Sequence, residues 1–244
     1  MPEGGINLLS QFAQTHRRFK SNLAMSQTPA VFLDRDGVIN RLIYHKDAGI
    51  VDSPFTAAQF QVFPWVPKAI RLLNDLGLPV VIVSNQPGIA KEHFDPEVLG
   101  EIEQQLNVAL VSGRAHLDAT YYCLHHPDAI VKDLRKNCSC RKPGIGMFTR
   151  AARDMDLSLE RSYMVGDGLT DIEAGHRAGC KTIFVGTWKC EHCQFIRPRG
   201  LRATAVAKDL LQAAHLIQQD FQSDMRSAGR LSKPSQRPAL HACY

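Results

Sequence analysis

Residues 30–40 read AVFLDRDGVIN, a short apolar run that ends in two acidic residues and a glycine. The apolar part is typical of a buried strand, because strands covered on both faces are continuously hydrophobic. Gly37 allows a sharp turn after that strand. Asp34 and Asp36 therefore follow a predicted strand directly, either as solvated loop residues or as members of a site.

The same pattern of a short strand followed by a helix recurs along the chain. Further strands are predicted at 79–83, 120–123, 162–165 and 181–185. Helices are predicted at 67–76, 95–111, 146–155, 170–178 and 209–219. This alternation predicts an α/β fold, a three-layer Rossmann-like parallel sheet with helices on both faces. The short gaps between the strands leave no room for a large cap domain.

Ligands of such sheets bind beyond the carboxyl ends of the strands. Ser84 and Asn85 follow the predicted strand 79–83, and Asp167 follows the strand 162–165. Carboxylate oxygens suit a hard divalent cation, and an aspartate can attack phosphorus. The basic pair Arg141 and Lys142 adds two cations of the kind that neutralise a transferring phosphoryl group. Each piece alone is weak, but together they predict phosphoryl chemistry with Mg²⁺.

Cysteine spacing predicts a second metal site. Cys123 and His125 are followed, after twelve residues, by Cys138 and Cys140. Three cysteines and one histidine in close pairs fit a tetrahedral structural Zn²⁺ site that clips the intervening loop at its base. Because Arg141 and Lys142 come next, this site would also fix where the two cations point. A further pair, Cys190 and Cys193, is either a weaker metal site or free thiols.

Charge and hydropathy restrict the class of protein. The net charge is +5, but residues 1–28 carry +2 and residues 222–244 carry +3, so residues 29–221 are neutral. A nucleic-acid enzyme is expected to carry its positive charge on the folded body, so the pattern argues against that partner. No apolar run approaches the ~20 residues that span a bilayer, and no signal-type run opens the chain.

We therefore expect a cytoplasmic enzyme with three segments. These are a leader without fixed structure at 1–28, a phosphatase domain at 29–221, and a basic tail without fixed structure at 222–244. The start of translation is open between Met1 and Met25. A monomer is the favoured state, and no membrane partner is expected.

Taken in order, these motifs resemble the haloacid dehalogenase (HAD) superfamily of phosphatases over about residues 29–220. The pattern is DRDGV at 34–38, Ser84 after an apolar strand, Lys142, and GDGLTD at 166–171. The resemblance implies that Asp34 is the nucleophile that forms an aspartyl-phosphate and that Asp36 is the general acid and base.

The resemblance also implies ligands and supporting contacts. Asp34, the backbone carbonyl of Asp36, and Asp167 would bind Mg²⁺. Ser84 and Lys142 would hold the phosphoryl oxygens. Asp171 would support the metal site.

The cysteine loop and the stretches DRDGVIN and SNQPGIA look like the D,D-heptose 1,7-bisphosphate phosphatase group. That likeness implies a small phosphorylated sugar as substrate, with His45, Asn85, Gln86 and Arg141 on the sugar side of the pocket. Gly168 departs from the group, which tends to carry a lysine there. Alternatives are a histidinol-phosphate phosphatase, a nucleic-acid 3′-phosphatase and a non-catalytic binding module.

Overall fold

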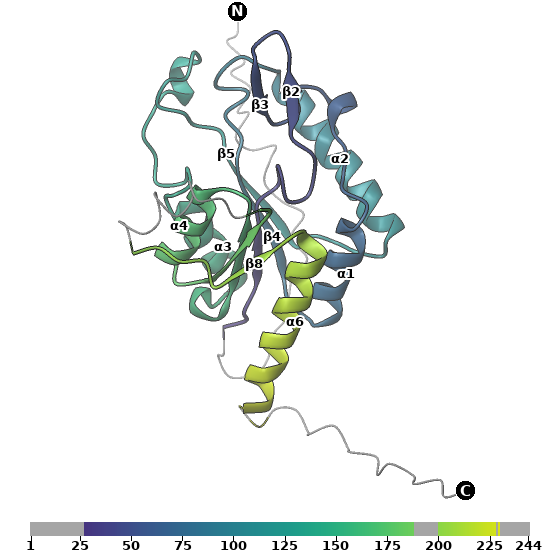
Figure 1. Ribbon diagram of the computed structural model, residues 1–244. Helices are drawn as coiled ribbons and strands as arrows, with labels where there is room; N and C mark the ends of the chain where they lie inside the picture. The colour runs from purple at the N-terminus through teal and green to yellow at the C-terminus, as the bar shows by residue number, and fades with distance from the viewer. Residues whose placement is uncertain (1–26, 188–199, 228, 230–244) are drawn as a thin grey trace, which may run out of the picture.

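A computed structural model describes residues 27–187, 200–227 and 229, and its centre is a six-stranded sheet (Figure 1). The strands are β1 (Val31–Leu33), β4 (Val80–Asn85), β5 (Ala119–Cys123), β6 (Tyr163–Gly166), β7 (Lys181–Val185) and β8 (Ala205–Ala207). They lie in the order β5-β4-β1-β6-β7-β8, and each neighbouring pair is parallel. The predicted parallel α/β sheet is confirmed.

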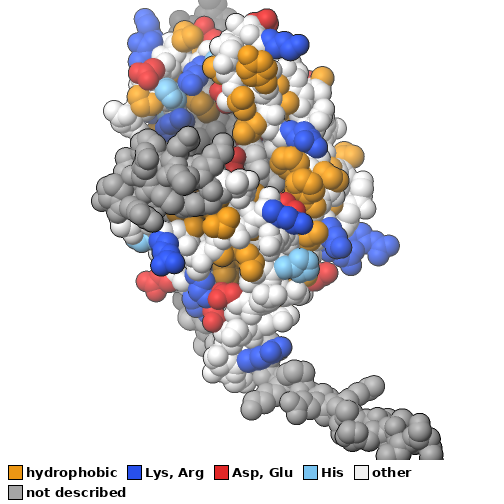
Figure 2. Space-filling view, in the orientation of Figure 1, with side chains coloured by type: hydrophobic (Ala, Val, Ile, Leu, Met, Phe, Trp, Pro, Cys, Tyr) orange, Lys and Arg blue, Asp and Glu red, His pale blue; other side chains and the backbone are white. Residues whose placement is uncertain are grey.

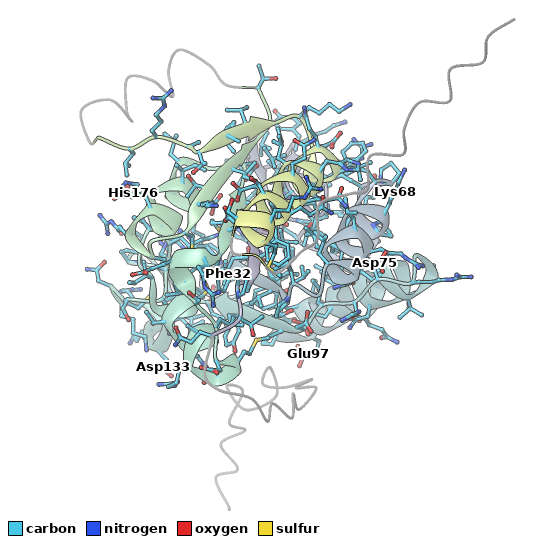
Figure 3. All side chains as sticks on the ribbon, turned by 90° about the horizontal axis from the view of Figure 1, so that it is seen from below. Phe32, Lys68, Asp75, Glu97, Asp133 and His176 are labelled. Carbon is cyan, nitrogen blue, oxygen red and sulfur yellow. The ribbon has the colours of Figure 1, made fainter. Side chains whose placement is uncertain are left out.

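Helices cover both faces of the sheet. They are α1 (Val66–Asp75), α2 (Pro96–Ser112), α3 (Gly146–Met155), α4 (Leu169–Arg177) and α6 (Leu210–Ser227), with 3-10 turns η1 (Ala57–Gln59), η2 (Lys132–Leu134) and η3 (Leu159–Arg161). Helices α1, α2 and α6 lie on one side, and α3 and α4 on the other (Figure 1). Figure 3 shows Phe32 of β1 between His176 of α4 and the α1 residues Lys68 and Asp75.

Alternation along β1 builds two separate cores, because successive strand residues point to opposite faces. Val31 and Leu33 pack into the core under α1, α2 and α6. Phe32, between them, packs into the core under α3 and α4. All three side chains are fully buried, so the strand that ends at Asp34 is fixed from both sides.

A two-stranded antiparallel hairpin, β2 (Ile43–His45) and β3 (Ile50–Asp52), follows β1. It was not predicted from the sequence, because each strand has only three residues. Its side chains include exposed Tyr44 and Val51, and Figure 2 shows hydrophobic side chains at the top of the molecule, where the hairpin lies. Among the described residues, the longest connections outside the helices are this hairpin region and the loop 124–145.

Most element boundaries lie within two residues of the predicted ones, and the following differences matter for the site and the sheet. Ser84 and Asn85 are the last two residues of β4 rather than residues after it. Helix α6 continues to Ser227, past the predicted end at 219. The edge strand β8 was not predicted, because a run of only three small or β-branched residues gives no period. None of the helices in the described ranges has the length and apolar character needed to cross a membrane.

We predict that Phe32→Ala destabilises the fold strongly. The ring of Phe32 is fully buried, and its centroid lies 4.9 Å from that of Phe148. Removing a buried phenylalanine ring costs about 3–5 kcal/mol in unfolding free energy, measured by urea denaturation. The control is Val108→Ala on α2, whose side chain is 64% exposed. Equal losses for the two variants would contradict this view of the core.

Candidate active site

The site begins where three adjacent strands end. Asp34 directly follows β1, Asp167 directly follows β6, and Ser84 and Asn85 close β4. Strand β1 lies between β4 and β6 in the sheet, so parallel pairing brings these carboxyl ends together. The predicted convergence at one edge of the sheet is therefore present in the structure.

Three carboxylates meet at this edge. One oxygen each from Asp34, Asp167 and Asp171 lies within 4.8 Å of the others. Asp171 comes from the first turn of α4 and accepts a hydrogen bond from the Gly168 backbone N–H at 2.9 Å. Asp171, predicted as a supporting residue, thus lies in the cluster itself.

One buried ammonium joins two of these carboxylates. Lys142 Nζ lies 2.8 Å from Asp34 Oδ1 and 2.6 Å from Asp171 Oδ1, and it donates to the Val83 carbonyl at 2.8 Å. Burial alone would lower the pKa of Lys142, but Asp171 and Asp34 outweigh that effect and raise it. Lys142 is therefore a permanent cation beside Asp34.

The negative charge of the cluster exceeds what Lys142 offsets. Burial first, and then the carboxylates of Asp34 and Asp171, raise the pKa of Asp167 to about 8. Burial also raises the pKa of Asp171 to about 6, although Lys142 opposes this. A hard divalent cation prefers carboxylate oxygens and would relieve the repulsion among them. The residues present therefore fit Mg²⁺.

Gly37 is needed for Asp167 to reach the cluster. Its φ of +84° lies in the left-handed region that favours glycine. A Cβ at this position would also collide with the carboxylate of Asp167. Both the turn after β1 and the approach of Asp167 therefore require a residue without a side chain.

Asn85 fixes the backbone of Lys142. Its Nδ2 donates to the Lys142 carbonyl at 3.1 Å, and the Lys142 N–H donates to its Oδ1 at 2.9 Å. The sequence predicts Asn85 as a substrate contact, but in the structure its amide is engaged by this pair of bonds. Asn85 therefore holds a residue of the site in place.

The carboxylate of Asp36 is held by three donors. It accepts from Arg35 Nη2 at 3.0 and 3.1 Å, from Asn40 Nδ2 at 2.9 Å, and from Gln86 Nε2 at 2.5 Å. Gln86 is fully buried, and its Nε2 also donates to Ser84 Oγ at 3.1 Å. Gln86 was predicted to face the sugar, and its amide instead contacts site residues.

The four predicted zinc ligands also come together. Sulfur atoms of Cys123, Cys138 and Cys140 lie 3.2–3.5 Å apart, and His125 Nδ1 lies 3.2 Å from Cys140 Sγ. Tetrahedral Zn²⁺ with Zn–S bonds near 2.3 Å needs sulfurs about 3.8 Å apart, so the sulfurs would have to separate by only a few tenths of an ångström to bind it. Hydrogen bonding with Cys123, and then with Cys138, lowers the pKa of the Cys140 thiol well below its usual range. This Cys/His cluster therefore fits a metal ion.

Two predicted substrate contacts are not members of the cluster of carboxylates. Arg141 Nη1 donates to the His125 carbonyl at 3.4 Å, which ties Arg141 to the Cys/His cluster. The ring of His45 stacks on Phe55 at 3.6 Å, and its Nε2 lies 2.9 Å from the Ser53 carbonyl. Cys190 and Cys193 lie outside the described residues.

Known proteins share both the sequence and the arrangement. Residues 139–213 match the family model described as HAD-hydrolase-like. A D-glycero-β-D-manno-heptose-1,7-bisphosphate 7-phosphatase of Photorhabdus laumondii is 39% identical over 162 residues, which cover 66% of this chain and 82% of that protein. The enzyme of the same name from Escherichia coli K12 is 36% identical, with 66% and 81% covered.

The chain belongs to the HAD-like phosphatase family.

It is therefore a phosphoric monoester hydrolase, as the sequence predicts. A solved structure supports the same family assignment. D,D-heptose 1,7-bisphosphate phosphatase from B. bronchiseptica, in complex with magnesium and phosphate, is 31% identical with a TM-score of 0.65, and the match covers 79% of this chain and 99% of that one.

The sequence assigned no role to Arg35 or Asn40, although both contact Asp36. Arg35 lies between two site aspartates, in the bend that follows β1. No sequence motif assigns a role to a single arginine in that position. Asn40 follows the turn and bonds to Asp36 four residues earlier, which only the folded loop reveals.

We predict that Asn85→Ala lowers phosphatase activity about tenfold or more, because Lys142 loses its backbone anchor and misplacement of a catalytic group is costly. Asn74→Ala is the matched control. Asn74 makes the same two bonds to the backbone of His116, at 3.2 and 3.0 Å, away from the site. Steady-state kinetics on any hydrolysed phosphomonoester tests this. Equal activity losses in the two variants would count against an anchoring role.

Proposed function

We propose that this HAD-like phosphatase hydrolyses its substrate through an aspartyl-phosphate on Asp34. The observation that supports this most directly is the contact of Asp34 with the buried ammonium of Lys142, beside Asp167 and Asp171. A carboxylate held next to a permanent cation at the open edge of a sheet is suited to attack on a polyanionic phosphate.

The proposed reaction has two steps. An oxygen of Asp34 attacks phosphorus while Asp36 donates a proton to the leaving oxygen, and the bond from phosphorus to that oxygen breaks. Water then attacks the aspartyl-phosphate while Asp36 takes its proton, and the bond from phosphorus to Asp34 breaks to release phosphate. Lys142 and Ser84 bind the phosphoryl oxygens, and Lys142 offsets charge that develops on them.

Magnesium is the cofactor proposed for this edge of the sheet. Asp34, Asp167 and the backbone carbonyl of Asp36 would hold it, and Asp171 supports them through the same carboxylate cluster. When bound, Mg²⁺ supplies positive charge that neutralises the phosphoryl oxygens and the attacking carboxylate.

The proposed substrate is D-glycero-D-manno-heptose 1,7-bisphosphate, from which the chain would remove the 7-phosphate in the cytoplasm, as part of surface-sugar synthesis. The names of the relatives from P. laumondii and E. coli support this. Arg141 and His45 come from the two segments that border the site, the metal-clipped loop and the hairpin, and they are the proposed sugar contacts.

Zinc is the proposed occupant of the Cys/His cluster. The donor set of three thiols and one imidazole supports this, because tetrahedral sites of this composition are typical of structural zinc. Bound there, the ion would hold the loop 124–145 so that Arg141 and Lys142 enter the site from a fixed point. The chain acts as a monomer in this proposal.

We predict that the protein with Mg²⁺ releases inorganic phosphate from heptose 1,7-bisphosphate faster than from histidinol phosphate or a 3′-phosphorylated oligonucleotide. Asp34→Asn should lose at least about a thousandfold in kcat, because the nucleophile is gone. Asp118→Asn is the control, since this aspartate accepts from the Val80 N–H just before β5. Retention of activity by Asp34→Asn would refute the mechanism, and preference for another substrate would refute the sugar assignment.

We predict about one zinc per chain by elemental analysis, as expected for a single structural site. Cys138→Ser should lose the metal and unfold at lower temperature, because metal binding there stabilises the folded loop. Cys180→Ser is the matched control, since Cys180 is a buried free thiol outside the cluster. Zinc retained at the wild-type level in Cys138→Ser would refute the assignment.

A further inference from the structure

A second buried cation, Arg35, lies behind the acidic cluster and has no part in the mechanism described so far. Its side chain is completely buried, and it is the largest side chain in the chain's described part to be so. Its Nη2 atom alone donates to both oxygens of Asp36, at 3.1 and 3.0 Å, and to Gln86 Oε1 at 2.8 Å. Burying a guanidinium is costly unless it is paired, so this placement requires Asp36 as its partner.

Gln86 completes a closed set of bonds with Arg35 and Asp36. Its Oε1 accepts from Arg35 while its Nε2 donates to Asp36 Oδ2 at 2.5 Å. The orientation of the amide is thereby fixed, because the oxygen must face the arginine and the nitrogen the carboxylate. The Asp36 carboxylate can turn away only by breaking bonds to Arg35, Gln86 and Asn40 together.

The Arg35 side chain also contacts an aromatic ring of the neighbouring strand β5. Its guanidinium carbon lies 5.6 Å from the centre of the Tyr122 ring on β5, a cation–π distance. Within the described ranges its Nε and Nη1 make no well-aligned hydrogen bond, but the Tyr122 hydroxyl lies near enough to interact with the guanidinium.

We propose that Arg35 and Gln86 are positioning residues that act as one unit, a clamp that sets the Asp36 carboxylate for proton transfer to the leaving oxygen. This rests on the proposed role of Asp36 as general acid and base. The clamp also reaches the phosphate side of the site, because Gln86 Nε2 donates to Ser84 Oγ at 3.1 Å. Proton donor and phosphoryl-binding hydroxyl are therefore aligned by the same amide.

The test uses Arg35→Met, Gln86→Met, the double variant and the conservative Arg35→Lys. The readout is kcat/KM, which reports steps up to departure of the leaving group. Two monoesters are compared, p-nitrophenyl phosphate, whose leaving group needs little protonation, and an alkyl sugar phosphate, whose leaving group needs an acid. We expect each single methionine variant to lose about 10–100-fold on the alkyl ester and at least about fivefold less on the aryl ester.

Two further outcomes are expected if the residues act as a unit. The double variant should lose no more than about threefold beyond the worse single variant, since the second substitution removes a clamp that is already broken. Arg35→Lys, which keeps a cation next to Asp36, should recover part of the loss on the alkyl ester. Equal losses on the two esters, or fully multiplicative losses in the double variant, would overturn the proposal.

Lys181→Met is the control for loss of a cation that pairs with an aspartate and a tyrosine ring, although its side chain is 33% exposed. Lys181 also lies 5.6 Å from a tyrosine ring, that of Tyr163, and contacts Asp220 at 2.6 Å, but at the start of β7. It should lower the melting temperature and leave the ratio of the two kcat/KM values unchanged. If Arg35→Met fails to fold, Gln86→Met and Arg35→Lys decide the outcome. A wild-type protein inactive on both esters would refute the proposed function instead.

Discussion

One buried ammonium, that of Lys142, joins the parts of the site that come from distant segments. It contacts Asp34 after β1, Asp171 on α4 and the Val83 carbonyl on β4. A buried cation without partners would be strongly unfavourable, so these segments must meet for Lys142 to be buried at all. The same requirement acts on the carboxylates, whose repulsion Lys142 partly offsets. Burial of Lys142 therefore couples formation of the site to formation of this edge of the sheet.

The Cys/His cluster controls where that ammonium enters. Cys140 stands two residues before Lys142, Arg141 between them bonds to the His125 carbonyl, and Asn85 holds the Lys142 backbone. The loop is also attached to the segment after β4, since the Ile130 N–H donates to the Ala90 carbonyl at 2.8 Å. A cation delivered by an irregular loop needs such anchors, because loops are otherwise more mobile than strands. The cluster thus holds the loop at a point two residues before Lys142.

The sequence was sufficient for five of the six strands of the sheet and for much of the site. Continuous apolar runs such as 79–83 identify buried parallel strands, and acidic residues at their ends identify one edge. The hairpin β2–β3 and strand β8 were not predicted, because a strand of three residues is too short to show a recognisable alternation of apolar and polar residues. The contacts of Asn85 and Gln86 were not predicted for a different reason. The sequence is the same whether an amide side chain at the end of an apolar strand contacts the substrate or a neighbouring residue. Only the tertiary packing determines which of the two it contacts.

Arg35 shows most clearly what could not be predicted from the sequence alone. In DRDG the two aspartates draw attention because carboxylates suggest chemistry, whereas the arginine between them looks like a solvated surface cation. In the bend after β1 its side chain enters a space closed by Gln86, which follows β4, and by Tyr122 on β5. The two aspartates consequently have different counter-ions, Lys142 for Asp34 and Arg35 for Asp36. A pair of carboxylates two residues apart can thus take two separate roles, because each is held by its own buried cation.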